Sequence, residues 1–574
     1  MEHYGDVQFH LEYPTTTLAG QILKCAAENP DRIAISYMGK NIKYSELASR
    51  IQTTAKAFIA LGVKPDEMVT VCLPNCPQAV YAMYALNLIG AISSMIHPLS
   101  SEGEIVQYLD KVSSRFAITL DLFKYKFDEV VKKHPLEKLI IASAADELNP
   151  IVRVGVGAFM TIKKKRVHLD KSDSKIISWP DFIRLADTVG EYKKSEKTAY
   201  ETAVILFSGG TTGTTKGIML SSYNFNALAY QTIEMAHDVD YSMLKVLAAM
   251  PIFHGFGLGI CIHTFLALGG TSILVPRFNV KSYAGLIKKK KPNYIAGVPT
   301  LYEALTRTNY LDGVNLSFLK GVFSGGDTLP TELKKRFDKY LDDHGSKVHV
   351  REGYGTTECV TASCLTPYCE EREGSIGLPF PDTYYKICKP GTTEEVPYGE
   401  EGEICLTGPT VMLGYLNNPQ ETADTLRRHE DGETWLHTGD LGVMDKDGFI
   451  YFKQRLKRMI ITSGYNVYPS QLENIIDAHP AVQMSCVIGV KDSYKMHKIK
   501  AFVVLKDGYV ASEDIRQQIY SYCKKNIAKY AMPYEIEFRD SLPKTLVGKI
   551  AYTVLEKETE EKEKLKEEAK QSNQ

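Results

Sequence analysis

The chain has 574 residues, which is several times a typical domain length and predicts more than one folded unit. Apolar residues make up 44% and charged residues 24%, a globular composition that excludes disordered, fibrous and membrane-embedded classes. The 68 basic and 69 acidic residues leave a formal net charge of -1, so no long-range field favours nucleic acid as a partner.

The start of the chain lacks the basic residues and the apolar run of a secretory signal. No stretch approaches the roughly 18 apolar residues that a transmembrane segment needs. The eleven cysteines include no C-x-x-C pair, and no histidine cluster lies near Cys72 and Cys76 in the sequence to complete a zinc site. We therefore predict a cytoplasmic protein with reduced thiols.

Helical patterns alternate with short apolar runs over residues 20–130. The runs are MVTVCLP (68–74), AISSMIH (91–97) and RFAITL (115–120). Alternation of this kind predicts strands and helices in an α/β layer structure.

The pattern loosens over residues 131–198, which we interpret as a peripheral insertion. Its run IVRVGVGAFMTI (151–162) precedes a basic cluster at 163–166. An apolar segment with a basic flank can rest on an anionic membrane, so peripheral membrane contact stays open. Because Arg153 interrupts the short run, a buried strand or hairpin is the preferred interpretation.

A loop of glycines, hydroxyls and one lysine follows the strand-like run 203–207 in TAVILFSGGTTGTTKG (202–217). Glycines let backbone N–H groups turn toward an anion, hydroxyls add donors and Lys216 adds a point charge, which suits a polyphosphate. Because Lys216 stands between Thr215 and Gly217, the loop is not a Walker motif. The predicted phosphate-binding residues are Ser208, Gly209, Gly210, Thr211, Thr212, Gly213, Thr214, Thr215 and Lys216.

The segment SGGTTGTTKG resembles the signature loop of the adenylate-forming superfamily, here its acyl-CoA synthetase and fatty-acid–CoA ligase branch. Further matching segments follow in the expected order, and the resemblance runs from about residue 15 to residue 555. It implies a mixed α/β fold, in which a large N-terminal domain of layered sheets and helices is joined by a hinge to a small α+β domain. The expected units are 1–453, the hinge 454–457, the small mobile domain 458–555 and a charged tail 556–574.

Two segments of the large domain resemble the pockets for the acyl group and for adenine. PIFHGFG (251–257) resembles the acyl-pocket segment, so the resemblance makes His254, Gly255 and Phe256 pocket residues. His254 is expected to gate or line the pocket and not to transfer protons. SGGDTLP (324–330) resembles the adenine pocket, where the backbone of Gly325 and Gly326 can approach the base.

REGYGTTE (351–358) offers an aromatic ring, hydroxyls and a carboxylate on a turn. Tyr354 can stack on a purine, and Glu358 can hold a magnesium ion whose other ligands are phosphate oxygens and water. The resemblance implies the same roles and adds a phosphate contact for the threonines, among them Thr357.

The resemblance assigns the remaining contacts to three segments near the C-terminal end. In WLHTGDLG (435–442), Asp440 is expected to accept from the ribose hydroxyls. In YFKQRLKRMIITSGYNVYP (451–469), Arg455 contacts ribose and phosphate, and Lys457 is the hinge residue. In SLPKTLVGKI (541–550), Lys549 neutralises the carboxylate and the α-phosphate as they approach each other.

These residues imply that a carboxylic acid attacks the α-phosphorus of ATP and expels pyrophosphate, after which a thiol takes the acyl group. ATP, Mg²⁺ and coenzyme A are the expected cofactors and co-substrates. The family further implies that the small domain turns about Lys457 between the two steps. An inactive nucleotide-binding module is disfavoured, because Lys549, Glu358 and Asp440 are all present.

The acid is predicted from HGFGLGICIHTFLALGG (254–270), which contains no acidic residue to bind an amino group. A medium- or long-chain fatty acid is therefore the first prediction, and an aryl acid is the alternative. An acyl-adenylate ligase that loads a carrier-protein thiol also stays open. The charged tail 556–574 is predicted to be a solvated helix or a frayed end.

Overall fold

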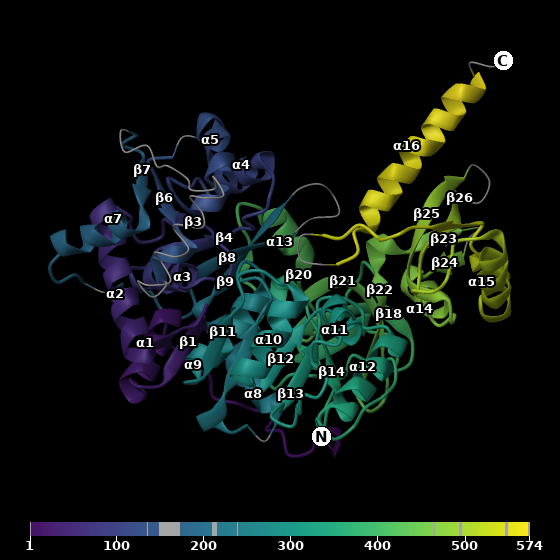
Figure 1. The fold of residues 1–574 in the computed structure, drawn as a ribbon, viewed down its shortest axis with the longest axis horizontal. Coiled ribbons are helices and arrows are strands. Elements are labelled where there is room, and N and C mark those ends of the chain that lie inside the picture. The colour runs from purple at the N-terminus through teal and green to yellow at the C-terminus, as the bar shows by residue number, and fades with distance from the viewer. Residues whose placement is uncertain are drawn as a thin grey trace.

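The computed structural model describes residues 2–134, 136–147, 173–193, 195–208, 215–237, 239–462, 465–492, 496–545 and 549–571. These residues form a large body of three sheets and a smaller body whose buried apolar clusters use only positions 460–555. The smaller body lies at the right of Figure 1. The predicted mixed α/β fold with a large N-terminal and a small C-terminal part is confirmed.

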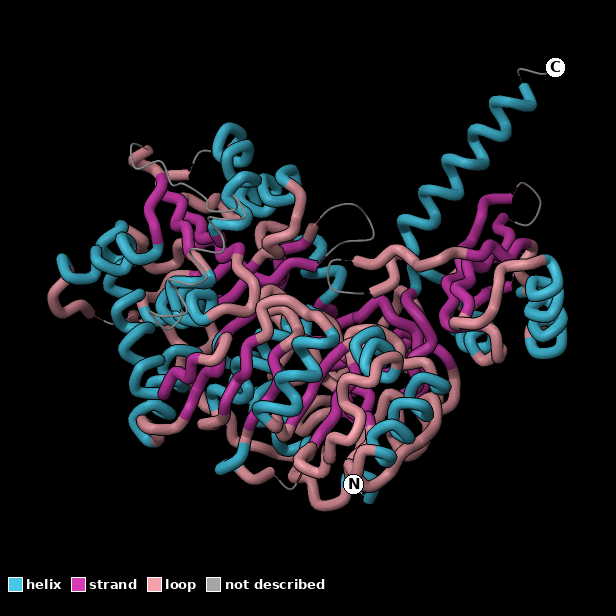
Figure 2. The backbone as a smooth tube through the Cα atoms, in the orientation of Figure 1, coloured by secondary structure: helices cyan, strands magenta, loops and turns pink. Residues whose placement is uncertain are grey.

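The first sheet of the large body has nine strands, and its central strands are parallel. Figure 2 shows its strands crossing the middle of the body. In spatial order they are β16 (Leu378–Pro379), β15 (Cys364–Leu365), β14 (Val350–Tyr354), β13 (Gly321–Ser324), β12 (Tyr294–Gly297), β10 (Lys245–Ala248), β11 (Thr271–Leu274), β1 (Ile33–Tyr37) and β2 (Lys40–Lys43).

The second sheet has eight strands and contains the three runs predicted from the N-terminal sequence. In spatial order they are β19 (Gly414–Tyr415), β9 (Lys216–Ser221), β8 (Thr202–Ser208), β4 (Ile92–Met95), β3 (Met68–Cys72), β5 (Phe116–Leu120), β6 (Lys138–Ala142) and β7 (Ile176–Ser178). Strands β3, β4 and β5 are buried and parallel, which explains their continuous apolar sequences. The described ends of the segment 131–198 supply β6 and β7 at one edge, whereas 151–162 and 163–166 lie outside the described residues.

The third sheet is antiparallel, in the order β17 (Tyr384–Cys388), β18 (Glu401–Thr407), β21 (Thr434–Met444) and β20 (Leu426–Arg428), with β22 (Ile450–Arg455) also paired to β21. The smaller body holds a two-stranded sheet of β23 (Ile460–Thr462) and β24 (Tyr465–Val467). Its three-stranded sheet consists of β25 (Val482–Asp492), β26 (Met496–Leu505) and β27 (Glu535–Phe538).

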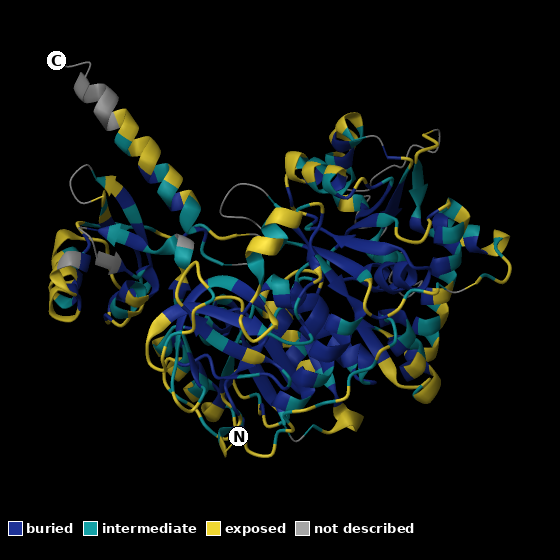
Figure 3. Cartoon of the chain, turned by 180° about the vertical axis from the view of Figure 1, so that it is seen from behind, coloured by how far each residue is buried: buried dark blue, intermediate teal, exposed yellow. Residues whose placement is uncertain are grey.

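Helices cover the sheets of the large body, and most of the strand residues there have the colour of buried residues in Figure 3. Every residue of α3 is buried, and apart from Gln78 and Asn87 its sequence is apolar or aromatic, as expected for a helix that is enclosed on all sides. Helix α10 has Lys288, Lys289 and Lys290 in its last turn, where cations suit the helix dipole. The helices of this body are α1 (Leu18–Glu28), α2 (Tyr44–Leu61), α3 (Pro77–Leu88), α4 (Glu102–Lys111), α5 (Lys124–Lys133), α7 (Trp179–Arg184), α8 (Ser222–Ala236), α9 (Phe265–Ala267), α10 (Val280–Lys290), α11 (Pro299–Thr306), α12 (Thr331–Asp343) and α13 (Pro419–Thr425).

The smaller body has the helices α14 (Pro469–Asp477), α15 (Glu513–Asn526) and α16 (Tyr552–Gln571). Most of the predicted charged tail belongs to helix α16 and is not a frayed end. This helix projects away from the rest of the chain (Figure 3). Buried Leu555 and the ion pair of Arg539 with Glu558, at 3.0 Å, attach its base to the three-stranded sheet. Among the described residues, no helix has the length and apolarity needed to cross a membrane.

Candidate active site

Strands β14, β21 and β22 bring three predicted nucleotide contacts together. The hydroxyl of Tyr354, at the end of β14, donates to Oδ2 of Asp440 at 2.8 Å. Arg455 is the register partner of Asp440, and its Nε lies 3.3 Å from Oδ1. Burial raises the pKa of Asp440, and Arg455 opposes this shift. Oδ1 is buried and accepts no hydrogen bond from the described residues, so this oxygen can accept from a ribose hydroxyl.

Lys549 approaches this site from the smaller body. It lies on a short hairpin, in which the Thr545 N–H donates to the Lys549 carbonyl at 2.7 Å. A Cβ atom on Gly326 would lie only 3.9 Å from Cε of Lys549. Burial lowers the pKa of Lys549, and the charges of Asp327 and Asp440 oppose this shift. The segment 541–550, which carries Lys549, and the loop 324–330, which carries Gly326, are far apart in the sequence but therefore meet in the structure.

The glycine pair after β13 forms a wall of the same site. Gly326 has φ +80°, a left-handed conformation that favours glycine. A Cβ on Gly325 would approach the carbonyl oxygen of Gly353 to 3.1 Å. The lack of side chains here therefore leaves the backbone accessible to a flat ligand.

Tyr415 links the predicted magnesium ligand to the predicted phosphate lysine. Its hydroxyl donates to Oε1 of Glu358 at 2.9 Å, and Nζ of Lys216 lies 4.7 Å from the centre of its ring. Lys216 also pairs with Glu421 on α13. Sequence reasoning missed Tyr415 and Glu421, because GYLNNPQE reads only as a turn followed by a helix start. Thr357 precedes Glu358 in the 3-10 turn Thr357–Cys359.

The two ends of the phosphate loop are adjacent. Ser208 at the end of β8 and Lys216 at the start of β9 are register partners. Thr215 is described beside Lys216, whereas positions 209–214 lie outside the described residues. Lys457 falls in the 3-10 turn Leu456–Arg458, and its side chain also lies outside the description.

An apolar pocket adjoins the glycine pair. None of the described side chains that line it is charged, and they include Thr232, Phe256, Ile260, Phe323, Ala362, Cys364, Leu365 and Phe380. His254 lies next to this pocket, and its Nδ1 accepts from the N–H of Phe256 at 3.2 Å. Burial, with a contribution from Lys549, lowers the pKa of His254 to about 3. A neutral imidazole at physiological pH suits a gate or wall better than an acid catalyst.

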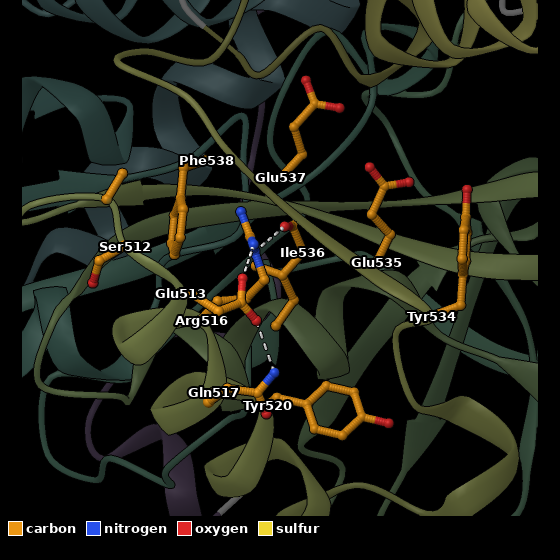
Figure 4. A pocket seen from close by; sticks show the side chains of 11 residues that line it. Ser512, Glu513, Arg516, Gln517, Tyr520, Tyr534, Glu535, Ile536, Glu537 and Phe538 are labelled. Atoms are coloured by element: carbon orange, nitrogen blue, oxygen red, sulfur yellow. Dashed lines mark hydrogen bonds and ion pairs between the residues drawn. The ribbon is translucent and has the colours of Figure 1, made fainter.

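Another hollow lies in the smaller body between α15 and β27 (Figure 4). It is polar, and Glu513 accepts there from Gln517 and pairs with Arg516. None of the predicted site residues lines it, so it is separate from the cluster around Asp440.

The AMP-binding enzyme family matches residues 23–416, and the AMP-binding enzyme C-terminal domain matches residues 471–549. The chain belongs to the AMP-binding enzyme family. The predicted resemblance is therefore confirmed, and the two matches fall on the large and the small body respectively.

Curated relatives agree with this membership, and a solved structure agrees with the fold. A long-chain-fatty-acid–CoA ligase of Bacillus subtilis is 35% identical, over 97% of this chain and 98% of the relative. A probable 4-coumarate–CoA ligase of Dictyostelium discoideum is 29% identical over 95% and 97% of the two chains. The crystal structure of an anthranilate CoA ligase in complex with anthranoyl-AMP has a TM-score of 0.80, at 23% identity over 95% and 97%.

Proposed function

We propose that this protein is an AMP-forming acid–CoA ligase that converts a long-chain or medium-chain fatty acid into its CoA thioester. It adenylates the acid with ATP, releases pyrophosphate and then transfers the acyl group to coenzyme A. The convergence of Lys549, Asp440, Arg455 and Glu358 on one site beside an uncharged pocket carries this proposal.

The residues have separate roles in the adenylation step. Asp440, held by Tyr354, fixes the ribose through Oδ1, which accepts no hydrogen bond from the described residues. Lys549 and Arg455 stabilise the negative charge that develops when the acid carboxylate and the α-phosphate approach each other. The protein supplies no covalent nucleophile, because positioning and charge stabilisation suffice for this transfer.

Magnesium fits the carboxylate of Glu358, because Mg²⁺ prefers oxygen ligands and usually binds one or two carboxylates together with phosphate oxygens. The bound ion would neutralise phosphate charge. The hydroxyl of Tyr415 orients Glu358 through the 2.9 Å hydrogen bond. Lys216, on the other side of the Tyr415 ring, is the cation for the distal phosphates in this proposal.

The fatty-acid assignment depends on the apolar pocket. None of the described residues that line it is charged, and the glycine pair next to Lys549 is part of its lining. Most of the curated relatives considered are long-chain-fatty-acid–CoA ligases, such as that of Bacillus subtilis. An aryl acid is the second candidate, because the Dictyostelium relative is named for 4-coumarate.

The division into domains at residues 454–457, with Lys457 as the hinge, is part of the proposal. Separate apolar clusters on either side of this point support it. Rotation there would withdraw Lys549 after adenylation and present another face of the small domain to coenzyme A. A cytoplasmic location is also part of the proposal, and the eleven free thiols, ten of them buried, agree with it.

A panel of carboxylic acids from C6 to C18, together with 4-coumarate and benzoate, tests the function when each is incubated with ATP, Mg²⁺ and coenzyme A. Thioester mass and pyrophosphate release should both appear with fatty acids. Pyrophosphate release without thioester, combined with acylation of a carrier protein, would instead establish the carrier-loading ligase. Absence of pyrophosphate release with every acid would refute the ligase assignment.

A further inference from the structure

Five buried polar side chains gather on the third sheet, away from the predicted nucleotide contacts. They come from β17, β18, β21 and the residue that follows β20, and each exposes at most 6% of its surface. The five are Cys388, Glu403, Cys405, His429 and His437. Nothing in the proposed adenylation chemistry uses them.

Strand register explains how they meet. Cys388 on β17 is the partner of Glu403 on β18, and Cys405 on β18 is the partner of His437 on β21. Directly paired residues on neighbouring strands project on the same side of the sheet. The side chain of His429 joins them from the hairpin after β20, where its N–H donates to the carbonyl of Glu433 at 3.0 Å.

Two overlapping triads of side chains are each close enough to share one ion, one of Cys388, Cys405 and His429 and one of Glu403, Cys405 and His437. Sγ of Cys388, Sγ of Cys405 and a ring nitrogen of His429 all lie within 4.8 Å of one another. Nε2 of His429 lies 3.0 Å from Nε2 of His437. Two nitrogens bound to one tetrahedral zinc ion would be about 3.3 Å apart, so only a small opening of this pair is needed.

Glu403 prepares His437 as a ligand. Its Oε2 lies 2.9 Å from Nδ1 of His437, a nitrogen that Sγ of Cys405 also approaches at 3.4 Å. Glu403 thereby holds the proton on Nδ1, and Nε2 of His437, which faces Nε2 of His429, is the nitrogen that can bind a cation. Nε2 of His429, which faces Nε2 of His437, is then the His429 nitrogen that binds the ion. Nδ1 of His429 is buried without a hydrogen-bond partner among the described residues, and an ion at Nε2 leaves it so.

We propose that Cys388, Cys405, His429 and His437 form a structural zinc site in the third sheet, with Glu403 as the carboxylate that orients His437. Two thiolates and two imidazoles are a ligand set typical of tetrahedral zinc. The thiols release their protons to solvent when the ion binds, and the ion balances the two thiolate charges. No oxidation or reduction is involved.

The site also connects to the nucleotide strand. Oε1 of Glu403 accepts from the N–H of Gly439 at 3.0 Å, and Gly439 precedes Asp440 on β21. An ion bound to His437 would therefore fix the carboxylate of Glu403, and through it the N–H of Gly439 beside Asp440. This part of the inference rests on the proposed function, whereas the metal site itself does not.

Metal analysis of the full chain, purified without a chelator or a histidine tag after growth with added zinc, tests the proposal directly. We expect about one zinc ion per chain, the stoichiometry of one such site. Replacement by Co²⁺ should give sulfur-to-cobalt charge-transfer absorption and intense tetrahedral bands in the visible range. These optical signals need no variant and do not depend on ligase activity.

Variants locate the ion. Cys388→Ser, Cys405→Ser and His429→Gln should each lower zinc affinity at least tenfold, and Glu403→Gln should lower it about tenfold through His437. Cys523→Ser, buried in the smaller body, and Cys369→Ser, exposed, should leave it unchanged. Zinc below one tenth of an ion per chain, even after zinc is added back, would overturn the proposal. So would undiminished zinc in the ligand variants, or a disulfide mapped between Cys388 and Cys405.

Discussion

The hydroxyl of Tyr354 donates to the carboxylate of Asp440 at 2.8 Å across 86 positions of sequence. This bond joins the first sheet to the third, because Tyr354 ends β14 and Asp440 lies in β21. Arg455 approaches the other oxygen of the same carboxylate, at 3.3 Å. The proposed ribose contact is therefore oriented from two sheets before any ligand binds.

Removal of that hydroxyl should weaken nucleotide binding. In Tyr354→Phe, Asp440 loses one of the two groups that orient it, and a hydrogen bond to a charged group is worth about 1.5–3 kcal/mol. Part of this energy should appear as a KM for ATP that is about tenfold higher. Tyr451→Phe is the matched control, because Tyr451 donates to Asp445 at 3.3 Å outside the nucleotide cluster. Equal effects of the two variants would contradict the proposed role of Tyr354.

Lys549 is expected to act in only one half-reaction. Lys549→Ala should lower the rate of acid-dependent pyrophosphate exchange by at least a hundredfold, because electrostatic groups of this kind contribute about 10²–10³. The same variant should still convert supplied acyl-adenylate and coenzyme A into thioester. Lys544→Ala, exposed on the same hairpin, is the control and should retain both reactions. Equal loss of both steps in Lys549→Ala would refute the division of labour.

Lys216 and Glu358 carry a local signal in the sequence, because one lies in a loop of glycines and hydroxyls and the other on a turn that offers a carboxylate. Gly326, Asp440 and Lys549 were predicted through the family resemblance. The structure brings the segments of these residues to one site, and their roles there stay predictions. The mixed α/β fold was predicted from the alternating apolar runs and from the family resemblance.

Residues whose role depends on strand pairing could not be predicted in this way. Tyr415 reaches Glu358 only because β19 pairs with β9, and Cys388 meets Cys405 and His429 only through the register of the third sheet. The proposed zinc site has no signal in the sequence for this reason. Successive ligands are 8 to 24 positions apart in the sequence, and they lie on separate strands or, for His429, directly after one. No short spacing therefore marks them.

Glu421 forms an ion pair with Lys216, the predicted phosphate-binding lysine, and should therefore compete with ATP for this side chain. The variant Glu421→Gln removes the negative charge that pairs with Lys216. Because a partly exposed ion pair is worth up to about 1 kcal/mol, the KM for ATP should fall by about two- to fivefold at unchanged kcat. Asp424→Asn, exposed on the same helix α13, is the charge control. A higher KM for ATP in Glu421→Gln would show that Glu421 positions Lys216 and does not compete for it.

Glu352 should make stability depend on pH. Burial raises the pKa of this carboxyl from 4.5 to about 7, although its Oε1 accepts from the N–H of Leu329 at 3.0 Å. The native protein then binds more protons than the unfolded chain between these two values. The contribution of Glu352 to the free energy of unfolding should therefore fall as pH rises from 4.5 to 7, by at most about 3 kcal/mol, and stay level above pH 7.

Denaturant unfolding of the wild type and Glu352→Gln at pH 5, 6, 7 and 8 measures this contribution. The amide keeps the oxygen that accepts from Leu329 and removes the titration, so the variant should gain stability relative to the wild type as pH rises. The exposed Glu332→Gln exchange on α12 controls for the loss of a charge. A constant difference between Glu352→Gln and the wild type at all four pH values would exclude the raised pKa.

The glycine before Phe256 should tolerate no side chain. A Cβ atom at Gly255 would lie 1.7 Å from the carbonyl oxygen of Val360, so Gly255→Ala must displace backbone that adjoins the apolar pocket. Overpacking of this kind costs about 1–3 kcal/mol, and the KM for the fatty acid should rise together with the loss in Tm.

Gly285→Ala is the matched control, because Gly285 lies in α10 with no atom within 4 Å of its Cβ position. There alanine should raise the free energy of unfolding by about 0.5–1 kcal/mol and leave the KM for the acid unchanged. Wild-type stability and wild-type KM in Gly255→Ala would show that this turn does not shape the acyl pocket.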